Sequence, residues 1–239
     1  PNLYDTHDLG TGIYANNSTF MLEGWKTCTA TDGSGCIEHE PNFKNLHYGI
    51  QAYAPCGNAV NIENTAFEDC HRAVLVDGIG NAHIVDNEVR MPDYPTGGHS
   101  AGYGIYLNGV MVHTVAENRI NNPIDATFYN GVYIAATGNI ENEVYKNKFF
   151  ADYDYNGIAT AYNNSQVQFS CNDFNDQMSH ISVYDGAIKE NQGFCLDNTQ
   201  DPAANTFNTT CNNSGDEHFW FNYASAISPF DYYFGTGSR

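Results

Sequence analysis

The feature that most constrains the fold of this chain is a short pattern that returns six times. Each copy has two apolar positions separated by one variable residue, and all but the last, which has His180, begin with a small residue. The central β-branched residues are 24, 31, 27, 26 and 23 positions apart. Repeats of this length are typical of a solenoid, in which every unit stacks on the unit before it. The central residues are Ile50, Val74, Ile105, Val132, Ile158 and Ile181.

Each unit also contains signals of further strands and of the turns between them. The apolar alternation predicts a strand with one buried face, and pairs such as Asp77-Gly78 and Asn108-Gly109 predict the turn that follows it. A second alternating segment, for example residues 82–85, leads to an Asn followed by an apolar residue. No segment of the sequence keeps an apolar period of 3.6 residues between helix caps, so we expect an all-β protein. The Asn of this second corner is Asn64, Asn87, Asn118, Asn147, Asn172 or Asn191.

These units resemble the right-handed parallel β-helix repeats of the pectate-lyase-like superfold. The Asn series resembles the internal asparagine ladder of that family, in which stacked amides satisfy buried polar groups. The resemblance covers residues 40–195 well and both ends loosely. It implies an all-β, right-handed parallel β-helix, a solenoid of roughly seven to nine coils. We expect one domain over 1–239, with an N-terminal coil and loop (1–45), regular coils (46–195), and an irregular loop with an aromatic C-terminal cap (196–239).

The charge balance limits the partners that the chain can have. Its net charge is −19, from 28 acidic and 9 basic residues, so no basic stripe is present to neutralise the phosphates of a nucleic acid. The same balance opposes direct attraction to a polyanionic glycan unless calcium mediates it. No apolar run reaches the length of a membrane span. The start at Pro1 indicates a processed or excised segment, so we expect other domains of a larger parent protein among its partners.

Seven cysteines indicate an oxidising compartment. None belongs to a CxxC motif, which argues against a zinc site. Together with abundant Asn, Gly and Tyr and little Lys, they predict a secreted or cell-surface protein. Cys171 lies in a predicted strand and is expected to be a buried free thiol. The candidate disulfides are Cys28–Cys36, Cys56–Cys70 and Cys195–Cys211, and the spacing alone does not fix this pairing.

An aromatic column on the outer face of the predicted first strands is the main candidate for ligand binding. The variable residue between the two buried positions faces outward, and it is Leu75, Tyr106 or Tyr133 in three successive units. Tyr103 lies nearby. Stacked aromatic rings on a flat sheet suit a sugar ring or a protein partner, so we expect a glycan or a cell surface to bind here. Tyrosine is also a good strand former at exposed positions, so support of the sheet is the alternative interpretation.

Candidates for catalysis and for metal binding are few. The segment Arg90–Pro95 matches the R-x-P-x-x-R motif of β-helix polysaccharide lyases at its first and third positions, but Pro95 replaces the final Arg. In such lyases a base acts beside calcium-bound carboxylates. Asp152 and Asp154 are spaced to hold calcium at a corner of the coil, or they belong to a solvated turn. No other cofactor is expected.

The sequence favours a non-catalytic role over an enzymatic one. We expect an extracellular β-helix segment that binds glycans or cell surfaces or serves as structure. The alternative is a polysaccharide lyase or glycoside hydrolase with a groove on the outer sheet face, for which Arg90, His99 and Tyr106 are the first candidates. The Asn205-Thr206-Phe207 motif and the aromatic ending at 229–233 resemble β-helix regions of secreted cargo of the bacterial type IX pathway, which also implies secretion.

Overall fold

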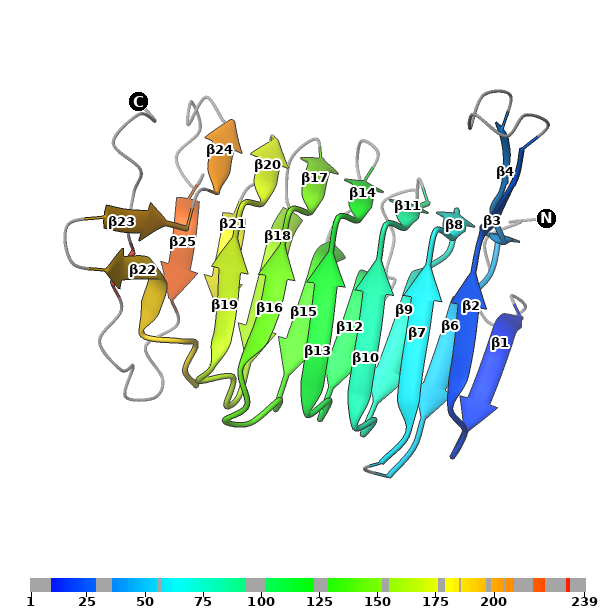
Figure 1. Ribbon diagram of the computed structural model, residues 1–239, viewed down its shortest axis with the longest axis horizontal. Coiled ribbons are helices and arrows are strands. Elements are labelled where there is room, and N and C mark those ends of the chain that lie inside the picture. The colour runs from blue at the N-terminus through cyan, green and yellow to red at the C-terminus, as the bar shows by residue number, and fades with distance from the viewer. Residues whose placement is uncertain are drawn as a thin grey trace, which may run out of the picture.

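The chain forms a row of stacked strands, and the part that the structure describes contains no helix. Figure 1 shows these strands side by side along the long axis, with the blue N-terminal strands at one end and the yellow to orange C-terminal strands at the other. The three large sheets are parallel, which confirms the predicted all-β solenoid. The computed structural model describes residues 10–28, 36–55, 57–92, 102–122, 129–151, 155–175, 179–184, 186–196, 199–203, 205–208, 217–221 and 231–232.

The first sheet collects the strand that begins each turn of the solenoid. Ile105 lies opposite Val74 on one side and Val132 on the other, in parallel register. The period of the sequence therefore records successive turns, as predicted. In spatial order its strands are β1 (Thr11–Asn16), β6 (Tyr48–Tyr53), β9 (Arg72–Asp77), β12 (Gly102–Asn108), β15 (Tyr129–Ala135), β18 (Tyr155–Ala161), β21 (Ser179–Val183) and β25 (Glu217–Phe221).

Two further parallel sheets complete each turn. The second sheet contains β19 (Val167–Ser170), β16 (Asn142–Tyr145), β13 (Val112–Ala116), β10 (Asn81–Val85), β7 (Ala59–Glu63) and β2 (Phe20–Glu23), in this spatial order. The third contains β24 (Thr206–Asn208), β20 (Asp173–Asn175), β17 (Lys148–Ala151), β14 (Arg119–Asn122), β11 (Glu88–Arg90), β8 (Ala66–Glu68) and β5 (Asn42–Lys44).

The regular part of the solenoid is shorter than expected. All three strands pair on both sides only in the successive turns β6–β8, β9–β11, β12–β14 and β15–β17. The count is thus about four turns, below the roughly seven to nine inferred from the repeat. The difference arises at the ends, where the turns are incomplete. An antiparallel hairpin, β3 (Trp25–Cys28) with β4 (Cys36–His39), separates β2 from β5.

The C-terminal end also departs from the regular coil. The second sheet ends at β19, although the first and third sheets continue to β25 and β24. The next strand along the chain, β22 (Asn191–Leu196), pairs antiparallel with β23 (Thr199–Pro202) and parallel with β26 (Asp231–Tyr232). Within the described residues, β22 therefore does not extend the second sheet.

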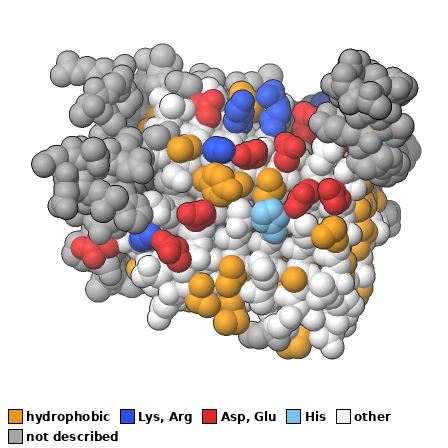
Figure 2. Space-filling view, viewed as in Figure 1, with side chains coloured by type: hydrophobic (Ala, Val, Ile, Leu, Met, Phe, Trp, Pro, Cys, Tyr) orange, Lys and Arg blue, Asp and Glu red, His pale blue; other side chains and the backbone are white. Residues whose placement is uncertain are grey.

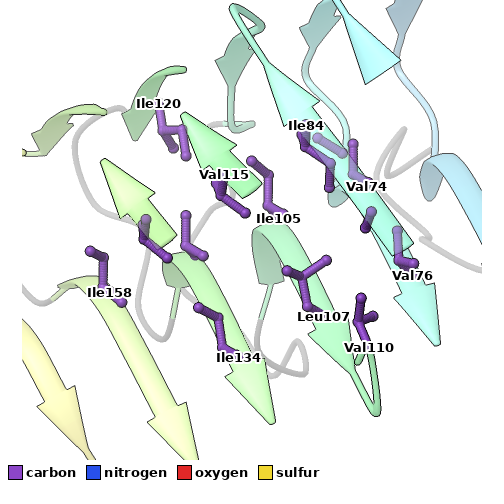
Figure 3. Close-up of a cluster of buried hydrophobic side chains, with 14 of the residues drawn as sticks. Val74, Val76, Ile84, Ile105, Leu107, Val110, Val115, Ile120, Ile134 and Ile158 are labelled. Carbon is purple, nitrogen blue, oxygen red and sulfur yellow. The ribbon is translucent and has the colours of Figure 1, made fainter. Parts of the chain in front are cut away.

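The interior is filled by the inward residues of all three sheets, because alternate side chains of each strand point to the same face. Phe149 and Phe174 stack with their ring centroids 5.0 Å apart, and Phe207 continues this stack at 5.5 Å from Phe174. Side chains from several strands point into this single core (Figure 3). Its fully buried members include Ile50, Val74, Ile105, Val132, Ile158 and Ile181 of the first sheet, and Ile62, Ile84, Val115 and Val144 of the second.

A buried ladder of amides runs along the corner between the second and third sheets, as predicted. From Asn118 onward, each side-chain Oδ1 accepts hydrogen bonds from the backbone N–H and from Nδ2 of the ladder residue one turn earlier, at 2.8 to 3.1 Å. Each Nδ2 also donates to a backbone carbonyl of that earlier turn. The ladder consists of Asn87, Asn118, Asn147, Asn172 and Asn205.

The prediction of this ladder was wrong at both of its ends. Thr65 occupies the first position, and its N–H donates to Asn87 Oδ1. Asn64 lies one residue earlier, at the left-handed turn position with φ 47°. Asn191 lies in β22, and Asn205 holds the last position instead. Asn suits both the ladder and a left-handed turn, so residue type alone could not separate two neighbouring positions.

One inward position of the second sheet holds a histidine. His113 of β13 occupies the place that Ala82 has in the turn before, and its side chain is buried. Burial lowers the pKa of His113 to about 3, and the nearby carbonyl of Val110 offsets this only in part. His113 is therefore neutral in the folded chain at pH 7 and must stay neutral as the pH falls.

Acid is expected to destabilise the fold through His113. The unfolded chain takes up a proton near the ordinary pKa of about 6.5 and the folded chain does not, so stability is lost as the pH falls from about 6.5 toward 3. This single group should cost about 2 kcal/mol between pH 7 and pH 5. Urea unfolding of the native chain and of His113→Val at both pH values measures the effect. Equal losses in the two proteins would contradict it.

Candidate ligand-binding face

The outer face of the first sheet carries its side chains in an unusual order. In β12, Gly104 and Ile105 are both buried, and a Cβ on Gly104 would lie 3.2 Å from the inward side chain of Ile120. Two successive residues thus face the core, and the rings of Tyr103 and Tyr106, three positions apart, meet on the outer side. A strict alternation of two does not predict this arrangement.

Three tyrosines form a cluster on this face, which we call the tyrosine cluster: Tyr103, Tyr106 and Tyr133. The rings of Tyr106 and Tyr133 are parallel within 3°, with centroids 5.2 Å apart. The ring of Tyr103 meets both edge-on, at 4.9 and 5.3 Å. Burial raises the pKa of Tyr103 and Tyr106, and raises that of Tyr133 to about 12. All three hydroxyls thus stay protonated at neutral pH and can donate hydrogen bonds.

Leu75 belongs to the same outward column but is itself buried. It lies opposite Tyr106 in the register of β9 with β12, and 7% of its surface is exposed. Of the four residues predicted to bind a ligand, the structure thus gathers the three tyrosines and leaves Leu75 with little surface to contact one.

An amide and hydroxyl network extends the face beyond the tyrosine cluster. Asn156 Nδ2 donates to Asn130 Oδ1 at 2.9 Å and to the Tyr184 hydroxyl at 2.7 Å. Ser182 Oγ donates to Asn156 Oδ1 at 2.7 Å. Sequence reasoning missed this network. Its signal was the presence of Asn130 and Asn156 at one repeat position in neighbouring units.

Arg72 lies at the other side of the tyrosine cluster. Its Nη1 donates to the Tyr48 hydroxyl at 2.6 Å. Its Cζ is 5.3 Å from the ring centroid of Tyr48 and 5.6 Å from that of Tyr103, a cation–π arrangement. Sequence reasoning did not select Arg72 either. Asp77, which accepts a hydrogen bond from Asn108 Nδ2 at 2.9 Å, is the one carboxylate among the side chains described on this face.

Of the residues predicted for catalysis and calcium binding, the described structure places Tyr106 alone on this face. Arg90 is exposed at the end of β11 and pairs in register with Glu68 of β8, so it belongs to the third sheet and not to the first. His99, Asp152 and Asp154 lie outside the described residues. Within the described ranges, no group of three or more His, Cys, Asp or Glu side chains is placed to hold a metal ion.

The cysteines differ from the predicted pattern where the structure describes them. Cys28 and Cys36 lie directly opposite each other on the backbone of the β3–β4 hairpin. Cys70 is a free, buried thiol, so the expected bridge to Cys56 is not formed. Its Sγ donates to the Phe43 carbonyl at 3.4 Å, and burial raises its pKa to about 11.

The remaining cysteines add one correction. Cys171 is free as expected, but it is exposed instead of buried, because it occupies the left-handed turn position between β19 and β20, with φ 55°. Cys56 and Cys211 lie outside the described residues. For Cys195 the structure gives only the backbone position, in β22.

These features define the class of the protein: a parallel β-solenoid with an aromatic and amide-lined outer face on its first sheet. No protein-family model, curated protein or solved structure matches the chain. The described part of the chain holds no helix that is long and apolar enough to cross a membrane.

Proposed function

We propose that this solenoid is a non-catalytic, extracellular segment that binds glycans on the outer face of its first sheet. The observation that carries the proposal is the tyrosine cluster, in which Tyr106 and Tyr133 stack in parallel and Tyr103 closes one side. The apolar faces of sugar rings pack on aromatic rings, and sugar hydroxyls bond to amides and phenols. Asn156 and Tyr184, which are half-buried at the edge of the tyrosine cluster, supply such polar groups.

The extracellular setting rests on composition. Seven cysteines, few lysines and a net charge of −19 support export from the cell. We propose that the solenoid belongs to the pectate-lyase-like superfold and that its parent is a secreted or cell-surface protein, in keeping with the resemblance to cargo of the type IX pathway.

Removal of a stacked ring should weaken glycan binding. We expect Tyr106→Ala and Tyr133→Ala each to lower the affinity for an oligosaccharide by about fivefold or more, since truncation of a central aromatic residue commonly costs over 1 kcal/mol. An oligosaccharide array identifies the best sugar, and calorimetry then measures its dissociation constant. Tyr145→Ala is the matched control, because Tyr145 is a half-buried tyrosine on the second sheet.

The outcome of this comparison decides the proposal. Unchanged affinity in both cluster variants, or an equal loss in Tyr145→Ala, would reject the face as the binding site. The rival prediction, a lyase or hydrolase, has no observation in its favour among the described residues, since Arg90 lies on the third sheet. Turnover of uronic-acid glycans with calcium, abolished by Arg90→Ala, would nevertheless replace the binding function.

A further inference from the structure

Arg72 is held in a fixed orientation on the proposed glycan-binding face. It is the one cation among the side chains described on the outer face of the first sheet. The rings of Tyr48 and Tyr103 lie near its guanidinium, and the bond from Nη1 to the Tyr48 hydroxyl fixes its rotation. A guanidinium has five N–H donors in one plane. The Tyr48 hydroxyl takes one of them, so further donors remain for a ligand.

Among the residues that the structure describes, no acid balances the charge of Arg72. Its Nε is buried without a hydrogen-bond partner, and no carboxylate among the described residues lies within ion-pair distance. Four other basic side chains do pair with an acid, and Figure 2 shows blue and red side chains next to each other on the side of the solenoid that it presents. The pairs are Lys44–Glu68, Arg119–Glu88, Lys146–Glu117 and Lys189–Glu141. Arg90 and Lys148 of the third sheet have no such pair within the described part of the chain, but both are exposed to solvent.

Arg72 differs from the exposed Arg90, which also has no ion pair among the described residues, because it is half-buried and its Nε is hidden from water without a partner. A buried donor without a partner costs stability, and the cost is recovered when an acceptor arrives. The guanidinium fork matches the two oxygens of a carboxylate or of a sulfate. Tyr103 contacts both Arg72 and the rings of Tyr106 and Tyr133, so an anionic group at Arg72 would be near enough to belong to the same glycan as a sugar on the tyrosine cluster.

We infer that Arg72 binds the anionic group of an acidic sugar residue in the glycan that occupies the tyrosine cluster. This inference rests on the proposed glycan-binding function and names the class of its ligand. One cation suits one acidic residue within an otherwise neutral glycan, and a net charge of −19 opposes a polyanion. The inferred ligand is therefore a glycan that is neutral except for a single uronate or sulfate.

Matched trisaccharides test the assignment. A gluco and a galacto trisaccharide are each prepared in three forms: neutral, with one terminal uronate, and with one 6-sulfate on the same residue. Calorimetry at about 0.15 M salt, where the screening length is about 8 Å, gives the affinities. The proteins are the native chain, Arg72→Gln, Arg72→Lys and the control Arg119→Gln, since Arg119 pairs with Glu88 on the third sheet.

The native chain should bind one acidic form at least tenfold more tightly than the neutral form. Arg72→Gln should remove this preference and leave the affinity for the neutral sugar within about twofold, because the tyrosine cluster is intact. Arg72→Lys should keep part of the preference, and Arg119→Gln all of it. A stronger effect with the uronate assigns a carboxylate to the site, and a stronger effect with the sulfate assigns a sulfate.

Three results would overturn the inference in distinguishable ways. Equal binding of neutral and acidic sugars by the native chain rejects the anion site and leaves the glycan-binding function in place. An acid preference that survives Arg72→Gln rejects Arg72 as its source. Failure of every trisaccharide to bind rejects the glycan-binding function itself, and the anion site with it. Circular dichroism checks the fold of each variant. If Arg72→Gln does not fold, the acid preference of Arg72→Lys is compared with that of the native chain instead, and an undiminished preference rejects Arg72 as its source.

Discussion

Asn118→Ala is expected to lower the free energy of unfolding by about 4 kcal/mol, because each buried polar group left without a partner costs about 1–3 kcal/mol. Asn118 is fully buried. Its Oδ1 accepts from the N–H and from Nδ2 of Asn87, and its Nδ2 donates to the carbonyl of Ile84 and to Asn147 Oδ1. Alanine removes all four bonds at once, in a site that its methyl group does not fill.

Urea unfolding compares this variant with Asn121→Ala. Asn121 lies in the neighbouring strand β14, and its half-buried side chain faces outward. The control should lose less than about 1 kcal/mol, as surface substitutions commonly do. If both variants lose the same amount, the amide ladder does not stabilise the coil in the way that its hydrogen bonds indicate.

Gly131→Ala is expected to destabilise the fold by about 3 kcal/mol, the upper range for an added methyl group in a packed core. A Cβ on Gly131 would lie 2.7 and 2.8 Å from ring carbons of Phe149 and 2.6 Å from the carbonyl oxygen of Gly157. Gly104→Ala is the matched control. Its Cβ meets a similar carbonyl at 2.6 Å, but its nearest side chain is the methyl group of Ile120 at 3.2 Å.

One turn of the native chain already combines an alanine at this position with a smaller residue in the third sheet. In the turn β9–β11 the same position holds Ala73, and the corresponding residue of the third sheet is Val89 instead of Phe. Phe149→Val should therefore relieve part of the cost of Gly131→Ala. A double-mutant cycle should give a coupling energy of at least about 1 kcal/mol, as neighbouring core residues do. Strict additivity would show that the ring of Phe149 is not what excludes the methyl group.

The fold could be predicted well from the sequence because its signal repeats. The apolar column from Ile50 to Ile181 defined both the period and the inward face, and the structure pairs these residues in parallel register. The ends of the solenoid were predicted less well. Strands of an incomplete turn keep the local sequence pattern of a strand, although they lack a paired strand on one side. Asn191 has such a pattern but lies in a strand that pairs antiparallel with β23.

The candidate site could be predicted only in part. Tyr106 and Tyr133 follow from the repeat, since they share one column. Tyr103 was predicted only as a neighbour of this column. Arg72 and Asn156 were not selected, because their outward direction depends on the extra inward residue at Gly104 and its equivalents. The partners of Arg72 lie 24 and 31 residues away in the chain, so their contact is set by the stacking of turns and not by local sequence.

The amide ladder gives each turn the same hydrogen-bonding groups on both sides. Asn118 receives from Asn87 the same bonds that it gives to Asn147, so an additional turn with this residue could enter the series without leaving a polar group unmet. Such a molecule can lengthen by duplication of the segment that encodes one turn. A duplication that keeps the 23- to 31-residue spacing preserves the ladder bonds and the stacking of apolar residues. Length is then a freely evolving property of this architecture, and the outer face can diversify turn by turn.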